Sequence, residues 1–466
     1  MPSILSKILM PHWSVPYNCY EIGHTWTPSC SEAAIELGII VFKESLKLYT
    51  PLYLLSQGLQ KGLDVNGLKQ SINSIIRSSL FLSFNGFSVI LLFCLTRQLM
   101  GKFYYSLCAY TPAFIGSLLA ITIERPSRRP ALALYVANIA SETIFRIFIS
   151  RGYMKPIKNG EILLFTVTMS ILLYIIKKNG FGVDPVSLAL KFIIGREESK
   201  RSNNKQNLSI DSNHMIQTNT FQLSQPVNTI YGKIVAKFYT LFPKHNSCPH
   251  KQNSCFSYIC YSFLRSFFFG WFGKSAFKTL SKPRAFLLRP NFIIRNNFFS
   301  SDNLKFGLFL ASFTAIYKGV NCSLRWASNG CHDWHAIIAA LFAGPTMFLS
   351  PNTSITLYLM WKCIESLYCI GVKKGYIKYV MPTVHIIYAI STAQLFYSAV
   401  LEPKHMKPSY MKFLDRVTGN RLHQLNRMVL DVFGTDASAG YETYIPDFDL
   451  KYTTKRFQES VLLWLL

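Results

Sequence analysis

Charged residues, and acidic ones above all, are scarce in this chain of 466 residues. Asp, Glu, Lys and Arg together make up 15% of it, whereas an ordinary soluble domain carries about 25%. Only 23 residues are acidic, against 49 basic ones, and 50% of all residues are hydrophobic. A surface this poor in charge is hard to keep hydrated, so the composition favours an integral membrane protein.

Catalytic and address motifs are also missing from the sequence. It has no Gly-rich phosphate loop, nucleophile elbow or dinucleotide fingerprint, so we expect neither an enzyme nor a cofactor. Residues 1–26 contain no apolar run long enough for a signal-peptide core. The last residues match neither a peroxisomal matrix-targeting signal nor a prenylation motif. Insertion is therefore expected to be directed by the spans themselves.

The excess of basic residues gives a net charge of +26, which in a soluble protein would suggest nucleic acid. Here the basic residues lie mostly between apolar segments, as do Arg128 and Arg129 or Lys177 and Lys178. Anionic lipid headgroups explain this placement better, so we expect a lipid bilayer as partner and no nucleic acid. Because nearly every connection is basic, the positive-inside rule leaves the orientation open.

Apolar stretches recur in two series, and most approach the length of about twenty residues that a helix needs to cross a bilayer. They lie at 33–57, 72–96, 103–123, 130–150 and 160–176, and then at 256–273, 304–320, 335–349, 354–372 and 383–401. The sequence thus predicts an all-α, polytopic helical membrane protein with two bundles of four or five helices. Its predicted parts are an N-terminal Cys/His segment (1–32), a first membrane repeat (33–195), a flexible polar linker (196–246), a second membrane repeat (247–419) and a polar C-terminal tail (420–466).

The two series are related by an internal repeat with an offset of 223 residues. At this offset Glu142 coincides with Glu365, and the Gly-Tyr-x-Lys element that begins at Gly152 coincides with the one that begins at Gly375. Coincidences of this kind are uncommon between apolar spans, so they indicate duplication. Five spans per half would make the halves inverted in topology and four would make them parallel, and the sequence leaves both open.

Glu142 and Glu365 are candidates for an intramembrane polar site. A carboxylate within a span costs roughly 2.5 kcal/mol or more and normally faces a partner, a cavity or the bundle interior. One interpretation is a contact for a proton, ion or substrate. The other, which we favour, is a structural bond between helices, for instance to Lys362.

A ladder of small residues on one face of the span at 304–320 predicts close helix packing. Its members are Gly307, Ala311, Ala315 and Gly319.

Two segments that precede the two series contain cysteines and a histidine, and they occupy roughly equivalent places in the repeat. Their residues are Cys19, His24 and Cys30 in the first segment and Cys248, His250 and Cys255 in the second. Metal ligation by four such groups is conceivable, but the spacing is not a standard zinc pattern. Reduced cysteines near the membrane are the simpler interpretation, so no metal is predicted.

Several motifs resemble those of the transmembrane protein 135 family. They lie at residues 18–30, 44–53, 124–129, 316–319, 324–326, 335–339, 407–410 and 430–435. The resemblance implies a multi-pass protein of mitochondrial and peroxisomal membranes, associated with the balance of mitochondrial fission and fusion, peroxisome organisation and lipid metabolism. It supplies no catalytic residues. The second half also resembles, more loosely, the module of mitochondrial inner-membrane translocases and small peroxisomal membrane proteins, although it lacks their full glycine pattern.

Two functions follow from these observations. The first is a membrane regulator or scaffold whose linker and tail recruit partners, with the mitochondrial fission machinery as a candidate. The alternative is a transporter or pore for a small solute or lipid, built from the two repeats. The resemblance favours the regulator.

Overall fold

The structure is a computed structural model, and it describes residues 14–462 apart from 62–64, 106, 108, 183, 200–243, 251, 253, 281–289, 379 and 381. Most of the predicted linker lies outside the described residues. The described residues are mainly helical, and their strands β1 (Ser14–Val15) and β2 (Phe103–Tyr104) form one antiparallel pair. The predicted helical architecture is confirmed to this extent.

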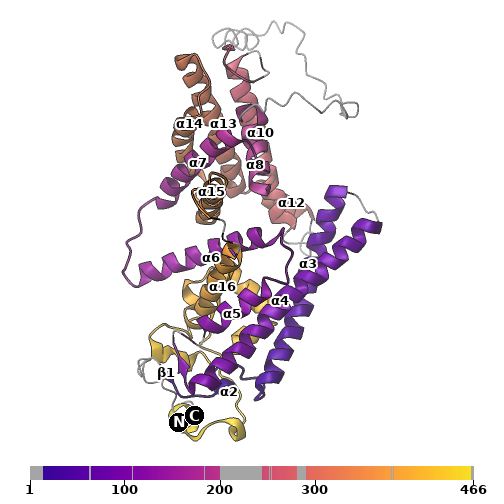
Figure 1. Ribbon diagram of the computed structural model, residues 1–466, viewed down its shortest axis with the longest axis vertical. Helices are drawn as coiled ribbons and strands as arrows, with labels where there is room; N and C mark the ends of the chain where they lie inside the picture. The colour runs from indigo at the N-terminus through magenta and orange to yellow at the C-terminus, as the bar shows by residue number, and fades with distance from the viewer. Residues whose placement is uncertain are drawn as a thin grey trace. The chain divides into compact units, whose positions relative to one another are not determined.

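The chain divides into two compact units, Met1–Pro156 with Ile377–Leu466 (unit 1) and Ile157–Tyr376 (unit 2). The main helices of unit 1 are α2 (Cys19–Ile22), α3 (Cys30–Lys61), α4 (Val65–Met100), α5 (Tyr110–Ala120), α6 (Arg129–Ser150), α16 (Thr383–Leu401) and α17 (Pro408–Val417). Those of unit 2 are α7 (Gly160–Asn179), α8 (Pro185–Ile194), α10 (Cys255–Leu280), α12 (Pro290–Phe298), α13 (Ser301–Ser328), α14 (His335–Ala343) and α15 (Thr353–Lys373). In unit 1, α3 and α4 form a long hairpin (Figure 1).

The order of the helices follows the internal repeat, but the units do not coincide with it. The series α3, α4, α5, α6, α7, α8 has its counterpart in α10, α13, α14, α15, α16, α17. Each unit contains the first four helices of one series and the last two of the other. Thus α16 packs on α5 and α6, while α7 packs in the equivalent way on α14 and α15. The predicted repeats at 33–195 and 247–419 therefore exchange their last two helices.

The repeated Gly-Tyr-x-Lys element is a helix stop. Gly152 ends α6 with φ 74° and Gly375 ends α15 with φ 75°, a left-handed conformation that suits glycine. The amide of the next residue, Tyr153 or Tyr376, donates at 2.9 Å to a carbonyl five residues earlier, which closes the last turn as in a Schellman motif. The chain changes unit directly after each stop, at residues 156 and 376.

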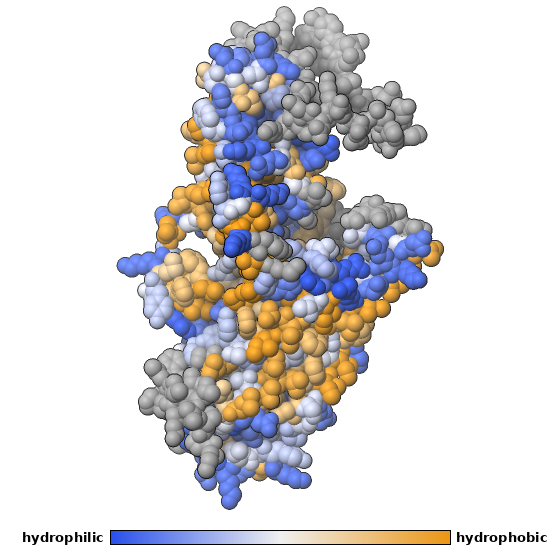
Figure 2. Space-filling view, viewed as in Figure 1, coloured by the Kyte–Doolittle hydropathy of each residue, from blue (hydrophilic) through white to orange (hydrophobic). Residues whose placement is uncertain are grey.

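Helix α4 is polar inside and apolar outside, the reverse of a helix on a soluble protein. Its buried residues include Ser71, Ser74, Ser78, Ser79, Asn85 and Ser88. Its exposed large side chains include Leu68, Ile72, Ile76, Leu80, Leu91, Leu95 and Leu99. Figure 2 shows apolar residues covering the visible face of α3 and α4 between hydrophilic ends. This distribution is favourable when lipid surrounds the helix.

Among the residues that the structure describes, five helices are long and apolar enough to cross a bilayer, namely α4, α6, α7, α15 and α16. Helix α5 and the segment made of α14 with the 3-10 turn η3 (Gly344–Leu349) are apolar but shorter. The protein is thus a multi-pass membrane protein. Fewer of the predicted apolar stretches qualify as spans than the sequence suggested, because several are too short or too polar as helices.

The predicted boundaries of the linker and the tail are altered. Residues Arg196–Glu198 (η2) continue the fold of unit 2, and Glu198 is buried there. The tail packs on unit 1: the Asn426 amide donates to the carbonyl of Glu21 at 2.9 Å, and the Arg427 guanidinium donates to that of Val400 at 2.8 Å. Burial lowers the pKa of Arg427 to about 10. The tail is therefore an integral part of unit 1 along the residues that the structure describes.

Within the predicted ladder of small residues, Gly307 marks the closest approach of α13 to α10. A Cβ atom there would lie 3.0 Å from both the Phe267 carbonyl oxygen and the Cβ atom of Trp271. At Gly319 a Cβ atom would be 3.6 Å from Ile259, an ordinary contact. Close packing is thus concentrated at one end of the ladder.

We expect Gly307→Ala to lower the stability of unit 2 by about 1–3 kcal/mol, because the added methyl group meets backbone atoms of α10 that cannot rotate away. Gly273→Ala on α10 is the matched control, since nothing lies within 4 Å of its added Cβ atom. That control should be neutral or stabilise by about 0.5–1 kcal/mol. Thermal unfolding in detergent, followed by circular dichroism, measures both, and equal melting temperatures for the two variants would contradict this packing.

Candidate functional site

The cysteines and histidines of the two N-terminal segments come together in two groups of four. Each group contains the three residues named from the sequence and one cysteine from a long helix. The groups are Cys19, His24, Cys30 and Cys94 in unit 1, and Cys248, His250, Cys255 and Cys322 in unit 2. In each group the potential ligand atoms all lie within 4.8 Å of one another.

The helix hairpins position both groups. Helices α3 and α10 begin at Cys30 and Cys255, next to the far ends of the helices α4 and α13, which carry Cys94 and Cys322. Sequence analysis missed these last two because a cysteine in an apolar helix is usually a small core residue. They are 228 residues apart, five more than the repeat offset, so an alignment without gaps does not pair them.

Neighbouring groups set the acidity of the thiols outside the spans. A hydrogen bond with Cys322 is the main reason why the pKa of Cys248 falls to about 5. In unit 1, hydrogen bonds with Cys19 and Cys94 lower the pKa of the Cys30 thiol. Each group therefore holds one thiol that ionises readily, and the thiolate is the form that binds metals.

The two carboxylates predicted as an intramembrane polar site lie in different units, and both are ion-paired. Glu142 on α6 contacts Arg146 at 2.6 Å and Lys407 at 3.9 Å. Glu365 on α15 contacts Lys362 at 2.5 Å. Each carboxylate thus has a cation on its own helix, and both the structural role and the transport role remain predictions.

A further ion pair, which sequence analysis did not find, is completely buried in unit 2. Arg325 on α13 and Glu198 in η2 face each other with side chains that are 0% and 1% exposed. The guanidinium donates to both carboxylate oxygens, one at 3.2 Å, and the Tyr258 hydroxyl donates to the carboxylate at 3.2 Å. Although burial alone would raise it, the facing guanidinium lowers the pKa of Glu198.

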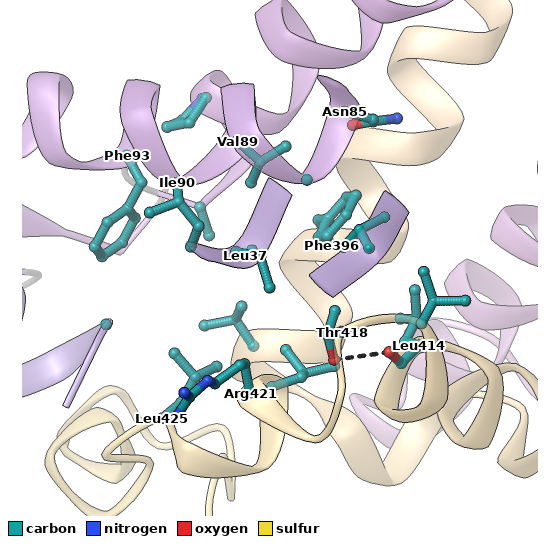
Figure 3. A pocket seen from close by; sticks show the side chains of 18 of the residues that line it. Leu37, Asn85, Val89, Ile90, Phe93, Phe396, Leu414, Thr418, Arg421 and Leu425 are labelled. Atoms are coloured by element: carbon teal, nitrogen blue, oxygen red, sulfur yellow. Dashed lines mark hydrogen bonds between the residues drawn. The ribbon is translucent and has the colours of Figure 1, made fainter. Parts of the chain in front are cut away.

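Unit 1 also contains an apolar cavity of about 140 Å³. Its walls come from α3, α4, α16, α17 and the tail, with Leu37, Val89, Phe396, Leu414 and Leu425 among the residues that line it. Figure 3 shows side chains of α4 and of the C-terminal segment on opposite sides of this space. Because its walls are far apart in the chain, sequence analysis had no signal for it.

Comparison with known proteins confirms part of the resemblance seen in the sequence. Residues 16–149 match the family described as the N-terminal cysteine-rich region of Transmembrane protein 135. The matching region covers α2 to α5 and all but the last residue of α6. It contains all four residues of the unit 1 group. No solved structure matches the chain.

We expect Glu198→Gln to destabilise unit 2 by about 3–5 kcal/mol, because it leaves the Arg325 charge buried without a counter-charge. Glu197→Gln, one residue away and only half-buried, is the control and should change stability by less than about 0.5 kcal/mol. Thermal unfolding at neutral pH in detergent checks this difference.

The same pair predicts the direction of the pH dependence. Since the folded pKa of Glu198 is lowered, its stabilising effect is present above the unfolded value of about 4.3 and is lost as the pH falls through the folded pKa. The difference in unfolding free energy between wild type and Glu198→Gln should therefore decrease on acidification below about pH 4. A difference that grew in acid would contradict this assignment.

Proposed function

We propose that this multi-pass membrane protein holds the end of a lipid's hydrocarbon chain in the cavity of unit 1, and that it acts without enzymatic activity in the lipid metabolism and organisation of mitochondrial and peroxisomal membranes. The cavity is the observation that carries the proposal. The resemblance to the transmembrane protein 135 family supports the choice of organelles and the link to lipid metabolism and mitochondrial dynamics.

The lining of the cavity favours hydrocarbon over water or a polar solute. Its volume of about 140 Å³ equals that of about five water molecules, but apolar cavities of this size stay dry and take up apolar molecules. An unfilled space leaves its lining atoms without dispersion contacts. A lipid chain supplied by the surrounding bilayer restores them.

Several of the polar side chains in the wall already have partners within the protein. The Asn85 amide donates to the Tyr388 hydroxyl at 3.2 Å, and the Thr418 hydroxyl donates to the Leu414 carbonyl at 2.8 Å. Arg421 forms an ion pair with a carboxylate of α3. These groups gain little from a polar ligand, and most of the lining residues are apolar, so the occupant is recognised mainly by its hydrocarbon.

The tail connects the cavity to the regulatory role predicted from the sequence. Leu414 on α17 and Leu425 beyond it form part of the wall, and Leu430 farther along the tail is fully buried. A lipid in the cavity therefore stabilises the docked position of the tail. In this proposal, lipid occupancy controls how the tail is presented to partners such as the mitochondrial fission machinery.

We expect Val89→Trp to lower labelling of purified protein by a photoactivatable fatty acid about tenfold, because the indole fills the space at a cost of one to three kcal/mol to any occupant. Mass spectrometry of the labelled peptides locates the sites. In wild type they should fall among the cavity-lining residues of α4, α16 and α17.

Leu91→Trp provides the matched control, since Leu91 lies on the same helix but is 40% exposed and does not line the cavity. It should label like wild type. Equal labelling of the two variants, or labelling confined to exposed faces, would rule out the cavity as the binding site. Re-expression of each variant in cells that lack the protein then tests the organelle role by mitochondrial and peroxisomal morphology.

A further inference from the structure

We propose that each Cys3His group binds a single zinc ion, so that the protein carries one structural zinc centre in each unit. The proposal is independent of the lipid-binding function. It rests on the placement of four ligand atoms in each group, on hydrogen bonds behind the histidines, and on the equivalent construction of the two groups.

The spacing of the ligand atoms fits one tetrahedral ion. Zn–S distances of about 2.3 Å and Zn–N distances of about 2.0 Å place neighbouring ligand atoms about 3.8 Å (S to S) and about 3.5 Å (N to S) apart. In unit 2 the sulfurs of Cys248 and Cys255 are 3.8 Å apart, and Nε2 of His250 is 3.3 Å from the Cys255 sulfur. A cluster of two irons would need ligands set farther apart.

Hydrogen bonds behind the two histidines orient them as ligands. Nδ1 of His24 lies 2.7 Å from the Thr27 carbonyl oxygen, and Nδ1 of His250 lies 3.1 Å from that of Gln252. A carbonyl accepts only from N–H, so it fixes the tautomer in which Nε2 is free to bind metal, a common outer-shell arrangement of zinc sites. Nε2 of His24 is buried and hydrogen-bonds none of the residues that the structure describes.

The same construction occurs twice in the chain. In each unit the first and second ligands come from the segment that precedes a long helix, the third begins that helix, and the fourth lies on its antiparallel neighbour. Chance proximity of cysteines does not account for a pattern kept in both halves of a duplicated fold, down to the bond between Nδ1 and a backbone carbonyl.

Four protein ligands leave no open position on a tetrahedral ion, which is the property of a structural centre rather than a catalytic one. Each ion would fasten the preceding segment to the ends of two helices. In unit 1 this segment also carries the capping box of α2, in which Asn18 and Glu21 bond to each other's backbone amides. Removing the ion should therefore loosen the segment together with the tail that packs on it.

The decisive experiment measures metals in the full-length protein, purified in detergent without added metal or chelator, by inductively coupled plasma mass spectrometry. We expect two zinc ions per chain, one in Cys94→Ser, one in Cys322→Ser and none in the double variant. Cys363→Ser is the matched control, because Cys363 is also buried in a helix but belongs to neither group, and it should retain both ions.

A second measurement does not depend on how the variants fold. Cobalt-substituted wild-type protein should show the absorption of tetrahedral cobalt with thiolate ligands, and zinc should displace it. Folded wild-type protein without stoichiometric zinc would overturn the proposal. So would disulfides within a group after native isolation, or iron with sulfide in its place.

Discussion

The exchange of the last two helices between the repeats is the constraint on which the rest of the structure depends. Neither series packs its own last helices: α16 covers α5 and α6, and α7 covers α14 and α15. Ion pairs join the exchanged parts, with Lys407 before α17 contacting Glu142, and Asp184 before α8 contacting Lys362 at 3.2 Å. Asp184 and Lys407 occupy equivalent positions in the repeat but carry opposite charges. Each therefore forms an ion pair with a residue of opposite charge on the neighbouring helix of its own unit.

Lipid as the surrounding solvent explains why polar residues are inside this protein. In hydrocarbon, an apolar side chain loses nothing by facing outward, whereas a serine or asparagine must find a bond within the bundle. Asn85 illustrates this, since it donates to Tyr388 and accepts from Ser117 at 3.3 Å. The polar interior therefore supplies the specific contacts between helices, while small residues such as Gly307 allow the backbones to approach.

Local features could be predicted from the sequence, and features that depend on which segments meet could not. The helical class, the repeat and the resemblance were visible because apolar length and recurring motifs such as Gly152-Tyr153 are written along the chain. The exchange of the last two helices could not be predicted, since an apolar helix face can pack equally well on the helices of its own repeat or on those of the duplicate. Cys94 was overlooked because it lies in an apolar helix like an ordinary core residue, and only the α3–α4 hairpin brings it to Cys30.

The exchange also fixes the order in which the two units can be completed during synthesis. Residues 157–376 are continuous, so unit 2 has all its helices once that stretch has left the ribosome. Unit 1 must wait for residues 377–466, and until then Asn85 lacks Tyr388. The first helices to be synthesised thus belong to the unit that is completed last. A chain truncated before α16 leaves unit 1 in the bilayer without its last two helices.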